Sequence, residues 1–143
     1  MGFFDPLGFV AQSDAAEFKV YRSAEIKHGR VAMLASVGLI GQHFIKLPGF
    51  EKIPSGIGAL NTTQGLVWLL ALALWAGLAE TKEWKQDPRK EAGNFGDPFG
   101  IGMYTEEMRS KEINNGRFAM ICVFGIIAAE LATGKDAVQQ FGL

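Results

Sequence analysis

Residues 22–40, RSAEIKHGRVAMLASVGLI, decide the fold, because residues 109–127, RSKEINNGRFAMICVFGII, repeat them with ten identities in nineteen positions and no gap. Each copy opens with polar residues, passes through Glu-Ile and Gly-Arg, and then becomes apolar. This is the pattern of a helix that enters an apolar environment. The sequence therefore predicts two related helices that carry charged side chains just inside their apolar parts.

Length and composition limit the class of protein. The 143 residues are expected to form one domain, residues 1–143. Hydrophobic residues make up 48% of the chain, which fits a membrane protein or a small, well-packed soluble domain. The net charge of −1 and the scattered basic residues argue against a nucleic-acid partner. Cys122 is the only cysteine, so no disulfide can form within the chain. We recognise no signal or transit peptide ahead of the domain.

The middle of the chain supplies the clearest membrane span. Residues 54–79 contain no charged side chain, and residues 61–79 are long enough, at about 1.5 Å per residue, to cross a hydrocarbon core of about 30 Å. We expect helices over about residues 15–45, 60–80 and 110–133. The outer two have only twelve uncharged residues each, 31–42 and 118–129, so they reach a spanning length only if they bring charges into the membrane.

The charges that the outer helices would carry inward are Glu25, Arg30, Glu112 and Arg117. Each would cost about 2.5–3.5 kcal/mol near the bilayer centre if it were unpaired. Arg30 lies about 140° around its helix from Glu25, so the partner must come from the other copy. Reciprocal pairs, Arg30 with Glu112 and Arg117 with Glu25, require two parallel helices that cross about an approximate two-fold axis. The sequence therefore predicts an all-α membrane protein with three transmembrane helices, of which the first and third cross and are related by an internal repeat.

The same helix faces carry candidate metal ligands. Glu25 and His28 lie about 60° apart around one helix, and Glu112 and Asn115 repeat that spacing. A carboxylate that an arginine neutralises, a neutral imidazole and an amide oxygen each keep a lone pair. Such groups are suited to donate to a metal that needs one further ligand, without leaving net charge in lipid.

These motifs resemble the light-harvesting chlorophyll-binding protein family. The resemblance rests on EIKHGRVAM and EINNGRFAM, on the two DP-x-G turns at 5–8 and 97–100, and on the three spans, and it covers essentially the whole chain. The run KVYRSAEIKHGRVAMLASVG and the connector KLPGFEKIPSGIGAL resemble the red-lineage chlorophyll a/c antennae with fucoxanthin, peridinin or related carotenoids. The resemblance implies crossed, ion-paired first and third helices, a shorter middle helix and pigments packed around them.

The resemblance also implies roles for particular residues. The expected ligands of chlorophyll magnesium are Glu25, His28, Glu112, Asn115 and Glu80, with Gln42 as a further candidate. Arg30 and Arg117 would balance the charge of the glutamates. Two turns, formed by Asp5, Pro6 and Leu7 and by Asp97, Pro98 and Phe99, would seat the ends of carotenoids.

Several positions depart from the family pattern or are expected to have a structural role. Ala129 stands where the family usually has a glutamine, and Leu72 stands where it has a second ligand on the middle helix, so these two sites are not expected. His43 is expected to be a structural residue. Lys27 is expected to extend along the protein surface toward water.

The function that the resemblance implies is that of an antenna rather than an enzyme. It would bind chlorophyll a, chlorophyll c and carotenoids such as xanthophylls, and would pass excitation energy to a photosystem. Its expected partners are a photosystem core, with photosystem I favoured on overall likeness to the red-algal type, neighbouring antenna subunits and thylakoid lipids. A photoprotective quencher of the same family is an alternative that the sequence does not separate from an energy collector.

A carboxylate-bridged di-iron enzyme is an alternative of a different class. Glu25-x-x-His28 has the spacing that ferritin-like bundles use, but those bundles need the motif on two helices and a glutamate on each of two more. The second copy here reads Glu112-x-x-Asn115, and only three helices are expected.

The distribution of basic residues predicts an orientation in the plastid thylakoid membrane. Eight Lys and Arg lie in the N-terminal segment and the loop over residues 81–111, against three, Lys46, Lys52 and Lys135, on the opposite side. Because basic residues favour the side from which a membrane protein inserts, the N-terminus of this multi-pass protein is expected to be stromal.

Overall fold

The computed structural model describes residues 5–8, 10, 13–82, 87, 89–94, 102 and 104–142. These residues form three long α-helices, α1 (Ala15–Phe44), α2 (Thr63–Lys82) and α3 (Glu106–Thr133), and two short 3-10 helices, η1 (Gly56–Asn61) and η2 (Gln139–Phe141). No β-strand occurs among them. The predicted all-α class is therefore confirmed for the described part of the chain.

Local sequence explains where the outer helices begin and end. The carboxylate of Asp14 caps α1, where it accepts a hydrogen bond of 2.8 Å from a first-turn backbone N–H. The hydroxyl of Thr105 caps α3, and Glu106 and Glu107 favour the positive end of the helix dipole. These three residues start α3 about one turn earlier than its apolar pattern suggests. Gly134, with φ of 70°, ends it in the left-handed conformation that favours glycine.

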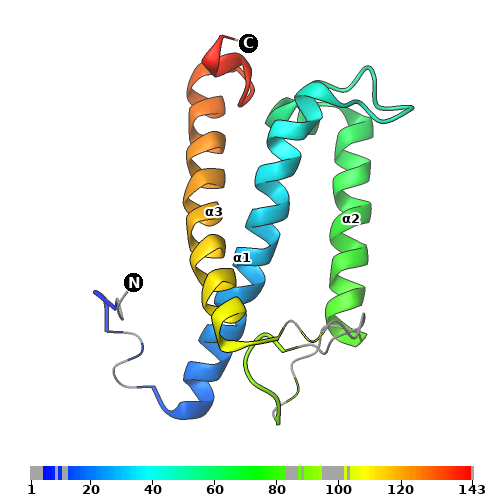
Figure 1. The fold of residues 1–143 in the computed structure, drawn as a ribbon. Coiled ribbons are helices and arrows are strands. Elements are labelled where there is room, and N and C mark those ends of the chain that lie inside the picture. Colours follow the sequence, from blue (N-terminus) through cyan, green and yellow to red (C-terminus); the bar gives the residue numbers. More distant parts are fainter. Residues whose placement is uncertain are drawn as a thin grey trace.

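Helices α1 and α3 run parallel and cross, whereas α2 runs in the opposite direction beside α1 (Figure 1). The crossing point is at Gly29 and Gly116, where a Cβ atom built on Gly29 would lie 2.9 Å from the Cα atom of Gly116. Ala32 and Ala119, one turn further along, are buried in the same seam. The two helices are therefore packed through small side chains, which allow the backbones to approach closely.

Helix α2 has no buried residue. Its large apolar side chains face outward, and Leu72 and Trp75 are each 60% exposed. A soluble protein rarely leaves so extended an apolar surface uncovered. By length and composition, α2 and α3 are both apolar enough to cross a membrane, and α1, with 30 residues, is long enough but does not meet the same test of composition.

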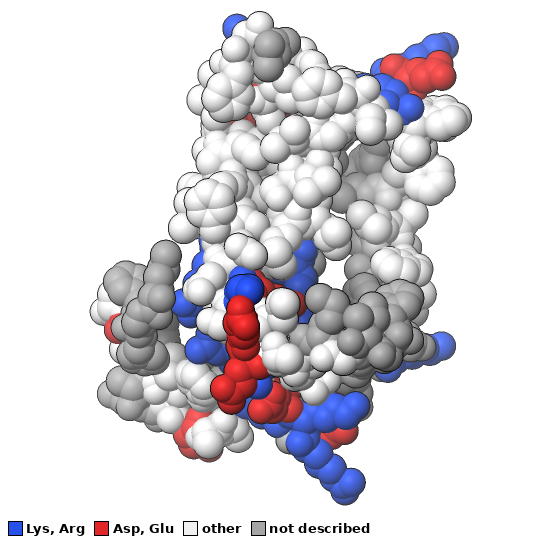
Figure 2. Space-filling model, in the orientation of Figure 1, with Lys and Arg blue, Asp and Glu red and all other residues white. Residues whose placement is uncertain are grey.

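The charged side chains gather at one end of the molecule. Figure 2 shows most of them around the end where α1 and α3 begin and α2 finishes, next to a broad uncharged band on the face that is drawn. An uncharged band bordered by charge is the surface that a bilayer requires.

The opposite end is closed by η1, which contacts α1, α2 and α3. Two buried carboxylates hold this end together. Glu130 accepts a hydrogen bond of 2.6 Å from the backbone N–H of Ile57. Asp136 accepts one of 2.6 Å from the Ser55 hydroxyl and pairs at 2.9 Å with Nδ1 of His43. The structural role predicted for His43 is therefore confirmed, because its ring ties the end of α1 to the C-terminal segment.

Candidate functional site

Two ion pairs join α1 and α3 on either side of the crossing. Nε of Arg30 lies 2.5 Å from Oε1 of Glu112, and Nε of Arg117 lies 2.6 Å from Oε1 of Glu25. These are the reciprocal pairs that the repeat led us to expect. All four side chains are half-buried. Each glutamate therefore has its charge balanced by the partner helix and keeps lone pairs on its carboxylate oxygens.

The two copies of the repeat differ in the number of arginines on the glutamate. Glu25 also pairs through Oε2 with Nη1 of Arg22, at 2.6 Å, on its own helix. The corresponding residue of the second copy, Arg109, pairs instead with Glu91 at 2.5 Å. Arg22 was not predicted as a partner of Glu25. The spacing of three residues between Arg22 and Glu25 was the available signal.

The loop that precedes α3 supports the second copy. Nη2 of Arg30 donates a hydrogen bond of 3.1 Å to the backbone carbonyl of Gly93. Gly93 has φ of 81°, and a Cβ atom there would lie 2.7 Å from Cδ1 of Ile26. Glycine is therefore required both by the backbone conformation and by the contact with α1. This loop fixes the second guanidinium nitrogen of Arg30 while Nε holds Glu112.

His28 has the geometry of a ligand with one available nitrogen. Its Nδ1 lies 2.7 Å from the backbone carbonyl oxygen of Ala24, one turn earlier. Because that oxygen can only accept a hydrogen bond, we assign the proton to Nδ1, which leaves the lone pair on Nε2. His28 is exposed to an adjacent groove, so Nε2 is available to a ligand in that groove.

The His28 groove is a cavity of about 710 Å³, which is in the range of small-molecule sites. Its walls come from α1 and α3, and α2 contributes Glu80 from its last turn. Nζ of Lys27 lies 3.2 Å from Oε1 of Glu80. Lys27, which was expected to extend along the protein surface toward water, thus also pairs with a predicted ligand. The apolar part of the wall is formed by Val20, Ala24, Val31, Ala32, Ala35, Met120, Val123, Phe124 and Ile127.

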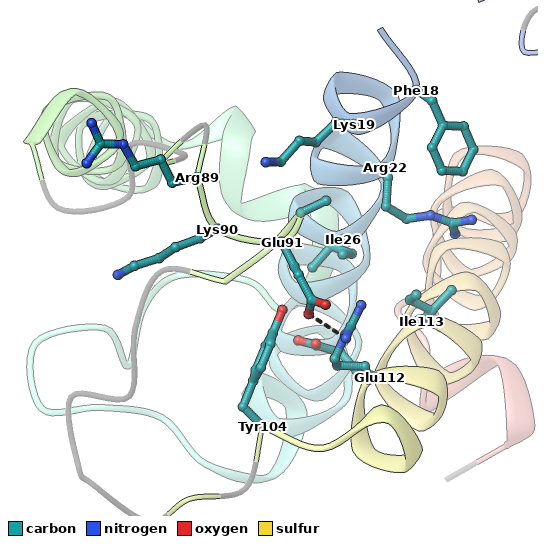
Figure 3. A pocket seen from close by; sticks show the side chains of 12 residues that line it. Phe18, Lys19, Arg22, Ile26, Arg89, Lys90, Glu91, Tyr104, Glu112 and Ile113 are labelled. Carbon is teal, nitrogen blue, oxygen red and sulfur yellow. Dashed lines mark ion pairs between the residues drawn. The ribbon is translucent and has the colours of Figure 1, made fainter. Parts of the chain in front are cut away.

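A second cavity, of about 550 Å³, lies beside Glu112. Figure 3 shows Glu91, Tyr104 and Glu112 converging on this cavity, with Ile26 of α1 and Ile113 of α3 in its wall. Burial raises the pKa of the Tyr104 hydroxyl, and neighbouring Arg109 opposes this shift. Tyr104 therefore remains a neutral hydroxyl at physiological pH.

Asn115 is exposed and lines a third cavity, of about 440 Å³. Glu112, Met33 and Met108 share this cavity. The Asn115 amide is thus presented to a cavity, as His28 is in the first copy, but this cavity is also lined by the charged side chains of Arg109 and Lys111. Gln42, the remaining candidate on α1, is half-buried next to the cluster at the η1 end.

The first of the two predicted turns lies in the described part of the chain. A carboxylate oxygen of Asp5 accepts a hydrogen bond of 2.9 Å from the N–H of Val10, and its backbone carbonyl accepts one of 3.3 Å from Gly8. Pro6 and Leu7 are exposed at the tip of this turn. The second turn, with Asp97, Pro98 and Phe99, lies outside the described residues.

No group of three or more His, Cys, Asp or Glu that could hold a metal ion occurs among the described residues. The glutamates of both repeat copies are held by arginine instead. In the described part of the chain, the candidate ligands that face the cavities are therefore single groups and not members of a metal-binding cluster.

The described residues form only helices and loops, with two apolar helices of membrane-spanning length and with cavities beside the helices that candidate polar ligands face. Residues 1–131 match the chlorophyll A-B binding protein family. The chain belongs to this family, and its resemblance to the chlorophyll a/c type is confirmed by the relatives below.

Curated relatives come from several organisms. The chain is 36% identical over 147 residues to the fucoxanthin-chlorophyll a-c binding protein E, chloroplastic, of Phaeodactylum tricornutum, with 91% of this chain and 74% of that protein covered. It is 34% identical over 158 residues to protein B of the same kind from Macrocystis pyrifera, with 96% and 71% covered. A relative from Chattonella marina var. antiqua is 34% identical over 149 residues, with 96% and 68% covered.

Proposed function

We propose that this protein is a photosynthetic light-harvesting antenna that binds chlorophyll a, chlorophyll c and carotenoids and passes excitation energy to a photosystem. Family membership and the names of the relatives support this proposal. The structural observation that carries it is the pair of glutamates, Glu25 and Glu112, that are balanced in charge by Arg117 and Arg30 across the crossed helices. The protein acts by binding and orienting pigments, not as an enzyme.

The ligands that we assign to chlorophyll magnesium are single oxygen or nitrogen atoms. Glu25 and Glu112 offer carboxylate oxygens whose negative charge arginine already balances, so a neutral pigment would add no charge in lipid. His28 offers Nε2 and Asn115 its amide oxygen, while Glu80 and Gln42 are further candidates. When bound, chlorophylls and carotenoids supply the absorption and transfer of light energy, and the helices fix their separation and orientation.

The proposed membrane arrangement has α1, α2 and α3 crossing the bilayer, with α1 and α3 related by an approximate two-fold axis. The reciprocal ion pairs and the mutual approach of Gly29 and Gly116 support this symmetry. Helices α1 and α3 both carry charged side chains, but Glu25 and Arg30 of α1 are paired with α3, which lowers the cost of burying them in lipid. The imbalance of eight basic residues against three supports a stromal N-terminus in a thylakoid membrane.

Pigments would fill the space between α2 and the crossed pair. Helix α2 packs mainly on η1, and the His28 groove lies between its last turn and the other two helices. A bound tetrapyrrole would cover apolar side chains there that otherwise lack protein neighbours. The turn formed by Asp5, Pro6 and Leu7 is proposed to seat the end of a carotenoid, as is the turn with Asp97, Pro98 and Phe99.

The proposed partners are a photosystem core and neighbouring antenna subunits. Photosystem I is preferred on overall sequence likeness to the red-algal type of antenna. Co-purification of the complex from thylakoids tests this preference, because recovery with photosystem II alone would reject it.

Reconstitution with purified pigments tests the proposed function directly. The chain should bind chlorophyll a, chlorophyll c and carotenoid in fixed ratios, and excitation of chlorophyll c should produce emission from chlorophyll a. A protein that retains iron and binds no pigment would reject the antenna and favour the di-iron alternative. The fluorescence lifetime of the same complex separates collection from quenching, since a very short lifetime indicates a quencher.

A further inference from the structure

Lys27 and Glu80 form an ion pair between α1 and α2 that the internal repeat does not explain. Nζ of Lys27 lies 3.2 Å from Oε1 of Glu80. The counterpart of Lys27 in the second copy is Asn114, and α2 lies outside both copies. The pair therefore belongs to the His28 groove alone, which both side chains line.

The position of Glu80, half-exposed at the end of the uncharged part of α2, favours a balancing charge. Residues 63–79 of α2 carry no charge, so Glu80 is the first ionisable group that the helix meets. It enters a groove whose other walls are mostly apolar. An isolated carboxylate would be costly there once lipid or pigment covers the groove, whereas a carboxylate beside an ammonium group is effectively neutral.

We propose that Lys27 is a positioning residue that balances the charge of Glu80, so that Glu80 ligates the magnesium of a chlorophyll in the groove that His28 also faces. This inference rests on the proposed antenna function. The ion pair uses Oε1 of Glu80, and Oε2 remains able to donate a lone pair. Arg30 and Arg117 pair with Glu112 and Glu25 in the same way, since each contacts one carboxylate oxygen of its glutamate.

The use of lysine here fits the geometry of the pair. Lysine carries a compact charge on a long flexible chain, so it reaches a neighbouring helix without the fixed fork of an arginine. Lys27 precedes His28 on α1, so the residue that holds Glu80 is adjacent in the chain to the other candidate ligand of the groove. The pair would thus set both the charge of one ligand and the position of α2 relative to α1.

Substitutions at both partners test this role in the reconstituted pigment complex. Lys27→Gln should weaken chlorophyll binding at Glu80 by about 10–100-fold, the usual effect of removing the outer partner of a metal ligand, and should lower the chlorophyll content per chain. Lys27→Arg should restore it. Lys135→Gln is the control, because Lys135 is exposed beyond the end of α3, lines none of the three cavities and should leave the pigment content unchanged.

The double variant makes the test specific for charge balance. Glu80→Gln replaces the carboxylate by a neutral amide that needs no counter-charge, so adding Lys27→Gln to it should remove no further chlorophyll. Thermal unfolding of the complexes, followed by helical circular dichroism, should show the same lack of additivity. Additive losses, or an unchanged pigment content in Lys27→Gln, would overturn the inference.

The outcome separates this inference from the proposed function. If the wild-type chain binds pigments and His28→Leu removes one, while Lys27→Gln removes none, the inference fails and the antenna function stands. If the wild-type chain binds no pigment, the proposed function fails first. Should Lys27→Gln not fold, the comparison of Lys27→Arg with Glu80→Gln still decides, since only the former should retain wild-type binding and stability.

Discussion

Gly29 and Gly116 are in backbone contact, since a Cβ atom on either one would lie 2.9 Å from the Cα atom of the other. Each glycine directly precedes the arginine of its helix, Arg30 or Arg117. The helices are therefore closest beside the two arginines, so their separation there also determines how far each arginine must extend to its glutamate. The short ion pairs depend on the absence of side chains at this point.

Gly116→Ala should destabilise the crossed pair. The atom that the new methyl group would meet belongs to the backbone of Gly29 and cannot rotate away, so the helices must separate, at a cost of about 1–3 kcal/mol. Gly125→Ala on the same helix is the control, because no heavy atom lies within 4 Å of the added Cβ atom and alanine favours the helix. Thermal unfolding by circular dichroism should show a lower midpoint for the first variant only. Equal midpoints would contradict the packing described here.

Substitution of Arg30 should destabilise the protein more than substitution of Arg117. Arg30→Leu removes the one arginine that pairs with Glu112, whereas Arg117→Leu leaves Glu25 with Arg22. The first substitution should therefore cost about 3 kcal/mol, the usual penalty for a stranded buried charge, and the second should cost less. Yield of folded complex and its thermal midpoint both measure this difference.

The control for this comparison is Arg22→Leu, which leaves Glu25 with Arg117. It should resemble Arg117→Leu, and the double variant lacking both arginines should resemble Arg30→Leu. A larger loss for Arg117→Leu than for Arg30→Leu would show that the additional pairing of Glu25 has no protective effect.

The crossing and its two ion pairs could be predicted from the sequence because the repeat gives two helices with the same charges at the same depth. Because an unpaired charge is costly in lipid, each of these charges is then expected to pair with an opposite charge on the other helix. Helix ends were predictable to within about one turn, and α3 starts earlier because Thr105 and two glutamates form a favourable first turn.

Contacts between segments of unrelated sequence could not be predicted in this way. The pairing of Lys27 with Glu80 depends on where α2 stands beside α1, and the repeat carries no information on that placement. The hydrogen bond from Arg30 to Gly93 depends on the path of a loop. Arg22 is a different case, since its spacing of three residues from Glu25 on one helix is sufficient to predict the pair.

The two histidines should respond in opposite ways to substitution by leucine. His28→Leu removes Nε2 from the His28 groove and breaks no contact between helices, so the complex should lose about one chlorophyll and keep its fold. His43→Leu removes the partner of buried Asp136, so it should keep its pigments and lose about 1–3 kcal/mol of stability. Pigment analysis and thermal unfolding on the same samples distinguish the two. Loss of pigment from both variants, or from neither, would contradict the assignment of His28.

Asp136 should make stability depend on pH only in strongly acidic solution. Burial by itself raises the pKa of this carboxyl group, but hydrogen bonds from the backbone of Gln139 and Val138, from Ser55 and from His43 lower it well below the ordinary 3.8. A group with a lowered pKa in the folded state stabilises the protein above its ordinary pKa, and this contribution is lost as the pH falls toward the folded value. Between about pH 7 and about pH 5 the contribution of Asp136 is therefore constant.

Asp136→Asn tests this predicted dependence of stability on pH. The variant should be less stable than the wild type by about 1.5–3 kcal/mol near neutral pH, because hydrogen bonds to a charged acceptor are replaced by weaker ones. The difference should persist to about pH 5 and shrink below about pH 4, as the wild-type carboxylate takes up its proton. Unfolding followed by helical circular dichroism across this range measures it. A difference that already shrinks between about pH 7 and about pH 5 would mean that this end of the molecule responds to moderate acidification, contrary to the hydrogen bonds that hold Asp136 ionised.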